Sequence, residues 1–126
     1  MESIYLKIAA LSGAAAVAIG AFGAHGLKAR VEPAMLEIYE TGVRYHFYHT
    51  LALLAVAAAF PGLWQSRWTH YACACWTLGM LIFSGSLYLL VLTGVTKLGA
   101  ITPIGGVALI LGWCFLFAAT FSMRTQ

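Results

Sequence analysis

Aspartate is absent from this sequence and glutamate is scarce, so that charged residues make up only 9% of its 126 residues. Ordinary globular chains carry about 25% charged residues, and this chain therefore has too few charges to cover a surface exposed to water. The absence of aspartate excludes a Ser-His-Asp catalytic triad. The net charge is only +3 and no basic cluster is present, which excludes nucleic acid as a partner.

Hydrophobic residues, in contrast, make up 62% of the chain, compared with about 45–50% in ordinary globular proteins. They form long runs of leucine, alanine, isoleucine and valine without strict alternation, a pattern that favours helices over strands. A bilayer suits such a chain, because its interior is apolar and a helix satisfies its own backbone hydrogen bonds there. The sequence therefore predicts an all-α integral membrane protein with the lipid bilayer as its surroundings.

Four apolar segments are long enough to cross a bilayer as helices. They cover about residues 4–24, 43–60, 69–92 and 100–122. Each approaches the ~20 residues that span ~30 Å of hydrocarbon. Residues 1–126 are therefore predicted to form a single transmembrane domain, a four-helix bundle.

The long polar stretch between the first two spans is predicted to contain a short helix. Pro33 is well placed as its first residue, because proline lacks only an N–H that would be unpaired there. From Met35 to Tyr39, apolar residues alternate with Glu37, and Glu40 follows. This pattern predicts an amphipathic helix that lies at the membrane interface.

Four spans place both termini on one side of the membrane. Positive charges lie on both sides in nearly equal number, so that the charge bias alone does not fix the orientation. One side carries Lys7, Arg67 and Arg124, and the other carries Lys28, Arg30, Arg44 and Lys97. We place the termini in the cytoplasm, on the assumption that Arg44 and Lys97 serve the helix bundle rather than the topology.

The densest group of polar residues at membrane depth lies at the start of the second span. On a helix, His46 and His49 share one face, and Arg44 lies nearly opposite. Three interpretations are open for the histidines: hydrogen bonds to neighbouring helices, a site for protons or a polar substrate, and a metal or haem site. A metal needs further ligands, and none has suitable spacing. No metal or cofactor is therefore predicted.

The third span carries polar or small residues on two opposite faces. Thr77, Ser84 and Tyr88 align along one face, and Gly79 and Ser86 align along the other. Hydroxyl and small residues allow helices to approach closely and to form hydrogen bonds across the contact. The pattern therefore predicts a helix that is packed between neighbours on both sides.

Small residues also form faces on the first and fourth spans. Ala16, Gly20 and Ala24 follow one another at helical spacing, and Gly106 lies on a face of the fourth span. Such faces are typical of tight helix packing in membranes. We expect them to support self-association into a homo-oligomer.

Four sequence motifs carry a resemblance to a known family. They are Gly20-Ala-Phe-Gly-Ala-His-Gly-Leu27, Tyr45-His-Phe-Tyr-His-Thr-Leu-Ala-Leu53, Phe83-Ser-Gly-Ser-Leu-Tyr88 and Leu98-Gly-Ala-Ile-Thr-Pro-Ile-Gly-Gly106. In this order they resemble the family called domain of unknown function 423, whose animal members are called transmembrane protein 256. The resemblance implies a small four-span membrane protein, in bacteria usually of the inner (plasma) membrane. It implies no established activity.

The polar residues of these motifs are the predicted site. They are His25, Arg44, His46, His49, Ser84, Ser86, Tyr88, Lys97 and Thr102. We expect them to gather near one membrane face and to bind or conduct a small polar solute, a lipid headgroup or a proton. The alternative is a non-catalytic accessory subunit or assembly factor of a larger membrane complex. An enzyme is not predicted, because no nucleophile–base pair and no carboxylate inside a span is present.

Overall fold

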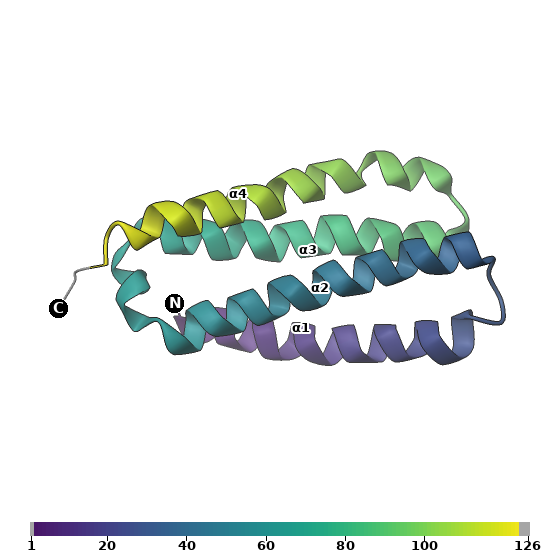
Figure 1. Ribbon diagram of the computed structural model, residues 1–126, viewed down its shortest axis with the longest axis horizontal. Coiled ribbons are helices and arrows are strands. Elements are labelled where there is room, and N and C mark those ends of the chain that lie inside the picture. The colour runs from purple at the N-terminus through teal and green to yellow at the C-terminus, as the bar shows by residue number, and fades with distance from the viewer. Residues whose placement is uncertain (1, 124–126) are drawn as a thin grey trace.

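The computed structural model describes residues 2–123, and these form four long helices joined by short connections (Figure 1). The long helices are α1 (Glu2–Phe22), α2 (Pro33–Ala59), α3 (Arg67–Thr93) and α4 (Thr102–Thr120). A π-helical turn, η1 (Gly23–Leu27), extends α1, and the 3₁₀ turns η2 (Pro61–Gln65) and η3 (Thr96–Ala100) lie in the two later connections. The described part of the chain is thus a membrane helical bundle, as predicted. Arg124 lies outside the described residues.

The ends of the helices follow from local residue chemistry. Pro33 is the first residue of α2, and Pro61 follows its end. The Ser66 side chain caps α3 by accepting a hydrogen bond of 3.2 Å from the backbone N–H of Trp68. Gly94 ends α3 with a φ of 73°, a left-handed conformation that glycine adopts without steric cost.

The segment that begins at Pro33 is helical, as predicted, but it is not a separate interfacial helix. It forms the first turns of α2, which continues without a break through Gly42 and runs along the bundle. The helix is continuous at Gly42, and the absence of a side chain there leaves room for Tyr88 of α3. A Cβ atom at this position would lie 2.9 Å from the ring of Tyr88.

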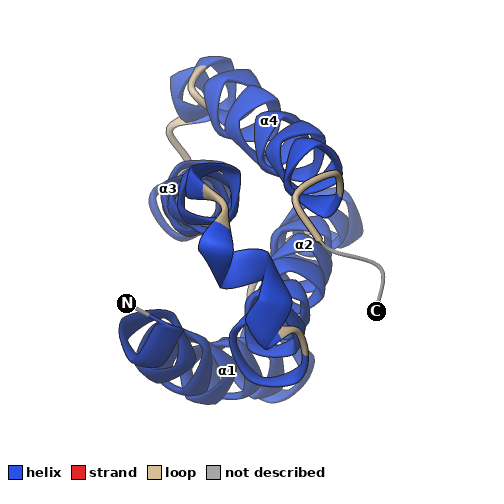
Figure 2. Cartoon of the chain, turned by 90° about the vertical axis from the view of Figure 1, so that its left-hand side faces the viewer, coloured by secondary structure: helices blue, strands red, loops and turns tan. Residues whose placement is uncertain are grey.

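The helices form two antiparallel hairpins that meet through α2 and α3. α1 packs on α2, α2 packs on α3, and α3 packs on α4. The end-on view shows α1 and α4 at opposite edges of the molecule, with α2 and α3 between them (Figure 2). The arrangement is therefore open, and α1 leaves the face of α3 next to it partly uncovered.

Glycines set the close approach of α3 and α4. A Cβ atom at Gly105 would overlap the backbone of Phe83, and one at Gly79 would lie 2.6 Å from the Leu109 side chain. A Cβ atom at Gly112 would overlap the indole ring of Trp76. The opposite faces predicted for α3 are confirmed here, because Gly79 indeed faces α4.

The small-residue faces expected to support self-association pack within the chain instead. Ala16 is fully buried, and a Cβ atom at Gly20 would lie 3.3 Å from Val43 of α2. Gly106 faces Phe83 of α3, and Ala24 is exposed. Self-association through these faces stays a prediction.

Three stretches of the described chain are long and apolar enough to cross a membrane, namely Ser3–Leu27, Arg67–Thr93 and Thr96–Thr120. α2 has the same length as α3, and polar residues such as Arg44, His46 and His49 lower its hydropathy. Large apolar side chains cover the outer surface, including Leu81 at 68% exposure and Phe117 at 67%. Soluble monomers rarely expose contiguous apolar surface on this scale, which supports an integral membrane protein.

Candidate functional site

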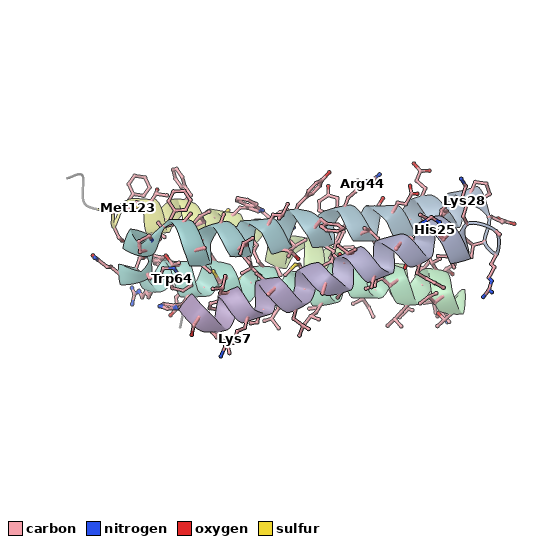
Figure 3. All side chains as sticks on the ribbon, turned by 90° about the horizontal axis from the view of Figure 1, so that it is seen from below. Lys7, His25, Lys28, Arg44, Trp64 and Met123 are labelled. Atoms are coloured by element: carbon pink, nitrogen blue, oxygen red, sulfur yellow. The ribbon has the colours of Figure 1, made fainter. Side chains whose placement is uncertain are left out.

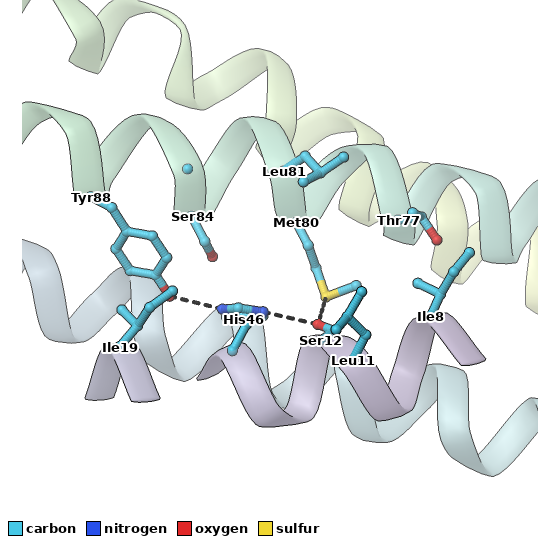
Figure 4. A pocket seen from close by; sticks show the side chains of 12 residues that line it. Ile8, Leu11, Ser12, Ile19, His46, Thr77, Met80, Leu81, Ser84 and Tyr88 are labelled. Atoms are coloured by element: carbon cyan, nitrogen blue, oxygen red, sulfur yellow. Dashed lines mark hydrogen bonds between the residues drawn. The ribbon is translucent and has the colours of Figure 1, made fainter. Parts of the chain in front are cut away.

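The side chain of His46 lies between α1 and α3 and bonds to both (Figure 4). Its Nε2 atom lies 2.9 Å from the hydroxyl of Ser12 on α1. Its Nδ1 atom lies 3.0 Å from the hydroxyl of Tyr88 on α3. His46 is near the middle of α2, so this contact lies at membrane depth and joins three helices.

The row of hydrogen bonds continues past Ser12. The Ser12 hydroxyl lies 2.6 Å from the hydroxyl of Thr50, which is one turn from His46 on α2. The Thr50 hydroxyl lies 3.6 Å from the thioether sulfur of Met80. Tyr88, His46, Ser12 and Thr50 therefore form one connected row, defined here as the polar row, that ends at Met80.

A cavity of about 410 Å³ opens beside the polar row, between α1 and α3. Most of its lining is apolar, and the polar side chains lie at the floor and along α3. The lining residues are Ile8, Leu11, Ser12, Ala15, Ile19, His46, Thr77, Met80, Leu81, Ser84, Gly85 and Tyr88. The predicted alignment of Thr77, Ser84 and Tyr88 on one face of α3 is confirmed by their place in this lining.

A second apolar hollow continues the cavity toward the end of the bundle that holds η1 and η3. It also measures about 410 Å³ and shares Ile19 and Tyr88 with the first cavity. Phe22 and Leu92 line its far part. The two hollows together form a lateral groove between α1 and α3, called the α1–α3 groove below.

Two polar groups of the cavity lining have their hydroxyl protons committed to the backbone. Ser84 donates to the carbonyl of Gly42 at 2.7 Å, and Thr77 donates to the carbonyl of Cys73 at 2.8 Å. A hydroxyl at membrane depth needs an acceptor, and these carbonyls provide one. Within the cavity lining, the polar groups that can still act as either donor or acceptor are therefore those of Ser12, His46 and Tyr88.

His49 is buried and points to a different neighbour from His46. Its Nδ1–H donates to the backbone carbonyl of Tyr45 at 2.8 Å. Its Nε2 atom accepts a hydrogen bond of 3.0 Å from the indole N–H of Trp113 on α4. These bonds fix one neutral tautomer, because a proton on Nε2 would remove the acceptor that Trp113 uses. His49 thus links α2 to α4.

The other residues of the predicted site do not join one cluster. Ser86 lies 2.6 Å from Thr102 and so links α3 to α4. Arg44 is exposed on the outer face of α2, where its guanidinium donates to Thr41 at 3.2 Å. His25 and Lys97 are exposed in η1 and η3, at the end of the bundle where Figure 3 also places Lys28. Only His46, Ser84 and Tyr88 of the predicted set line the cavity.

Two residues of the polar row, Ser12 and Thr50, are absent from the predicted site, and Ser12 is the harder to find from the sequence. Ser12 is the one serine or threonine between residues 4 and 24, and its neighbours along the chain are apolar. Its depth in the first span was the available signal, because polar groups at membrane depth need partners. Nothing in the sequence shows that the partner is His46.

The described residues, 2–123, contain no group of three or more His, Cys, Asp or Glu side chains that could hold a metal ion. Cys73 is buried and Cys75 is partly buried, both on α3, while Cys114 is exposed on α4.

The open helical bundle, its apolar exterior and the polar row at its centre define a small integral membrane protein. Residues 19–106 match the family described as protein of unknown function (DUF423). The chain belongs to this family, as the sequence motifs predicted.

Relatives from several bacteria match nearly the full chain. The UPF0382 membrane protein YwdK of Bacillus subtilis is 38% identical over 92% of this chain and 94% of its own length. A UPF0382 membrane protein of Haemophilus influenzae is 39% identical over 99% of both chains. The UPF0382 inner membrane protein YgdD of Escherichia coli is 36% identical over 100% of this chain and 96% of its own. No solved structure matches this chain.

Proposed function

We propose that this protein binds a membrane-dissolved amphiphile in the α1–α3 groove, with the polar end of the ligand at His46 and its apolar body against α1 and α3. One observation carries the proposal, namely that Ser12, His46 and Tyr88 meet at the floor of a cavity whose walls are otherwise mostly apolar. Ligand sites commonly combine an apolar lining with a few convergent polar groups, at volumes of about 300–1,000 Å³. The cavity volume of about 410 Å³ falls in this range.

The position of the groove favours a ligand that arrives through the bilayer. The cavity opens sideways between α1 and α3, where lipid rather than water would surround the helices. A small polar solute is less suited to such walls, since Ile8, Leu11 and Leu81 offer it no hydrogen bond. Conduction of protons also has less support, because the polar row ends at the thioether of Met80, a weak acceptor without a proton to pass on.

α2 is proposed to cross the membrane with the other helices. It lies beside α3 and has the same length. Its His46, His49 and Thr50 side chains bond to neighbouring helices, whereas Arg44 is exposed. We place the protein in the bacterial inner membrane, because the relative from Escherichia coli is named an inner membrane protein. Cytoplasmic termini remain the proposed orientation.

A pair of neighbouring alanines provides the test. Ala15 lines the cavity, whereas Ala14 is exposed outside it, so that Ala15→Phe fills the groove and Ala14→Phe is the matched control. Gly85→Leu fills the groove from α3, where a new Cβ atom meets no atom within 4 Å. The measurement is quantitative mass spectrometry of the lipids that copurify with each variant after gentle extraction.

The expected result is one class of amphiphile that copurifies with the unchanged protein and with Ala14→Phe. Ala15→Phe and Gly85→Leu should both lose it while they accumulate to the same level. Equal lipid profiles in all four proteins would overturn the proposal. A protein partner that the unchanged chain retains and both groove-filling variants lose would also overturn it, and would favour the accessory-subunit alternative with a partner helix in the groove.

A further inference from the structure

The polar row has no fixed direction of hydrogen bonding. Both nitrogens of His46 face hydroxyl groups, those of Ser12 and Tyr88, and a hydroxyl serves equally as donor or acceptor. The direction of the bonds from Tyr88 through His46 and Ser12 to Thr50 therefore depends on which nitrogen carries the proton. His49 differs in this respect, because a backbone carbonyl and an indole N–H fix its tautomer.

In the first arrangement the proton of His46 is on Nε2. Nε2–H then donates to Ser12, and the Ser12 hydroxyl passes its own proton on to Thr50. The Tyr88 hydroxyl donates to Nδ1. Tyr88 then shows the cavity only the lone pairs of its oxygen, so that it accepts a hydrogen bond from a ligand hydroxyl.

In the second arrangement the proton of His46 is on Nδ1. Nδ1–H donates to the oxygen of Tyr88, Ser12 donates to Nε2, and Thr50 donates to Ser12 instead of to the weak acceptor Met80. The proton of the Tyr88 hydroxyl is then free of His46. Tyr88 donates it to a ligand carbonyl in the cavity.

We propose, on the basis of the ligand site described above, that the amphiphile is a membrane quinone and that the groove binds both its quinone and its quinol form. A quinone presents a carbonyl where its quinol presents a hydroxyl, and the polar row offers Tyr88 as donor to the first and as acceptor to the second. The switch needs only the tautomer change of His46 and no movement of the helices.

The shape of the groove agrees with such a molecule. The cavity at His46 takes the ring, and the second hollow, which shares Ile19 and Tyr88 with it, takes the apolar tail. Tyr39 lines that hollow, and its hydroxyl is committed to the backbone carbonyl of Ile19 at 2.6 Å. The tail would therefore contact only the carbon atoms of the Tyr39 ring.

The binding experiment uses the full chain in detergent micelles and native mass spectrometry. The probes are decylubiquinone, its reduced quinol, and decylbenzene, which has the same tail and no oxygen atoms. The unchanged protein should bind the two oxygen-bearing probes with dissociation constants within about threefold of each other, and decylbenzene about tenfold more weakly, as expected for the loss of one hydrogen bond.

Two variants test the role of the polar row. Tyr88→Phe removes the group that meets the ligand, and it should weaken both forms about tenfold. Ser12→Ala leaves Nε2 without a partner, and since an unpaired buried N–H is rarely tolerated, His46 should keep its proton on Nδ1. The quinol hydroxyl could then only accept from Tyr88, with its own proton left unpaired, so that the quinol should bind about tenfold more weakly while the quinone is retained.

Thr120→Val is the control, because Thr120 lies on α4 outside the cavity and its hydroxyl donates to the backbone carbonyl of Phe117. It should leave both affinities unchanged. Equal weakening of quinone and quinol in Ser12→Ala would overturn the tautomer switch. Binding of neither form above the level of decylbenzene would overturn the ligand class, and the lipid profiles of Ala15→Phe and Ala14→Phe would then decide separately whether the groove binds another amphiphile.

Discussion

Replacing Gly105 by alanine, with Gly106→Ala as its neighbour and control, tests whether α3 and α4 depend on glycine for their close approach. A Cβ atom at Gly105 would lie 2.8 Å from the Cα and 2.9 Å from the Cβ of Phe83, and closer still to its backbone nitrogen. Because backbone cannot turn aside as a flexible side chain does, the helices have to separate. At Gly106 the nearest atom is Cδ2 of Phe83 at 3.7 Å, which is ordinary contact.

The expected difference between the two variants follows from these contacts. Overpacking costs about 3 kcal/mol at the upper end of its usual range, and separation of the helices weakens the nearby Ser86–Thr102 hydrogen bond of 2.6 Å, which contributes about 1 kcal/mol. The gain in helix propensity on replacing glycine by alanine is about 1 kcal/mol in both variants. Gly105→Ala should therefore lower the free energy of unfolding by about 3 kcal/mol, and Gly106→Ala should raise it by about 1 kcal/mol.

The assay is unfolding in mixed micelles by titration with sodium dodecyl sulfate, followed by circular dichroism and tryptophan fluorescence. Both variants add one methyl group at adjacent positions, so that effects on detergent binding largely cancel in the comparison. Similar shifts of the two midpoints, in either direction, would refute the argument that backbone contact at Gly105 sets the distance between the helices.

Two further predictions use the same titration. Trp113→Phe keeps an aromatic ring next to Trp76, whose ring centroid lies 4.7 Å from that of Trp113, but leaves Nε2 of His49 without its donor. It should lower the free energy of unfolding by about 1 kcal/mol. An unchanged midpoint would show that the bond is dispensable. Gly23→Ala places a methyl group 2.5 Å from the Tyr39 ring, which the bond to Ile19 holds in place, and should lower stability by about 1–3 kcal/mol. Gly85→Ala, with no atom within 4 Å, is its control, and equal losses in both would contradict the steric explanation.

The two faces of α3 could be predicted from the sequence because a helix has a fixed period. Residues three and four apart share a face whatever the neighbours are, so that Ser84 and Tyr88 had to lie together, with Ser86 on another side. The sequence does not show what each face meets. That Ser86 bonds to Thr102 and Ser84 to the backbone of Gly42 depends on the distances between helices.

The two histidines show where the same reasoning stops. His46 and His49 are three residues apart and thus only about 60° apart around the helix, which places them on one stripe. α2 meets α1 and α3 on one part of that stripe and Trp113 of α4 on another. A difference of 60° is therefore enough to send the two side chains to different partners. Periodicity alone cannot resolve such a division, because it depends on where the neighbouring helices lie.

The sequence also could not show that α2 is a helix of 27 residues from Pro33 to Ala59 and stays continuous through Gly42. Glycine in a polar stretch reads equally well as a break or as a packing residue. The ring of Tyr88 settles the matter, since it occupies the space that a side chain at Gly42 would need. The contact also brings Tyr88 within reach of His46, which lies one turn further along α2.

The hydrogen bonds distinguish the polar groups whose proton position is fixed by their partners from those whose proton position is not. Within residues 2–123, the polar groups of Ser84, Thr77 and His49 each face a partner that fixes where the proton lies, so that their bonds have one direction. His46 faces two hydroxyls, and each of its tautomers can bond to both of them. Helix packing alone does not require that the His46 proton can lie on either nitrogen. Next to a cavity, the freedom lets Tyr88 match either a donor or an acceptor, and it is the physical reason for placing the ligand at His46.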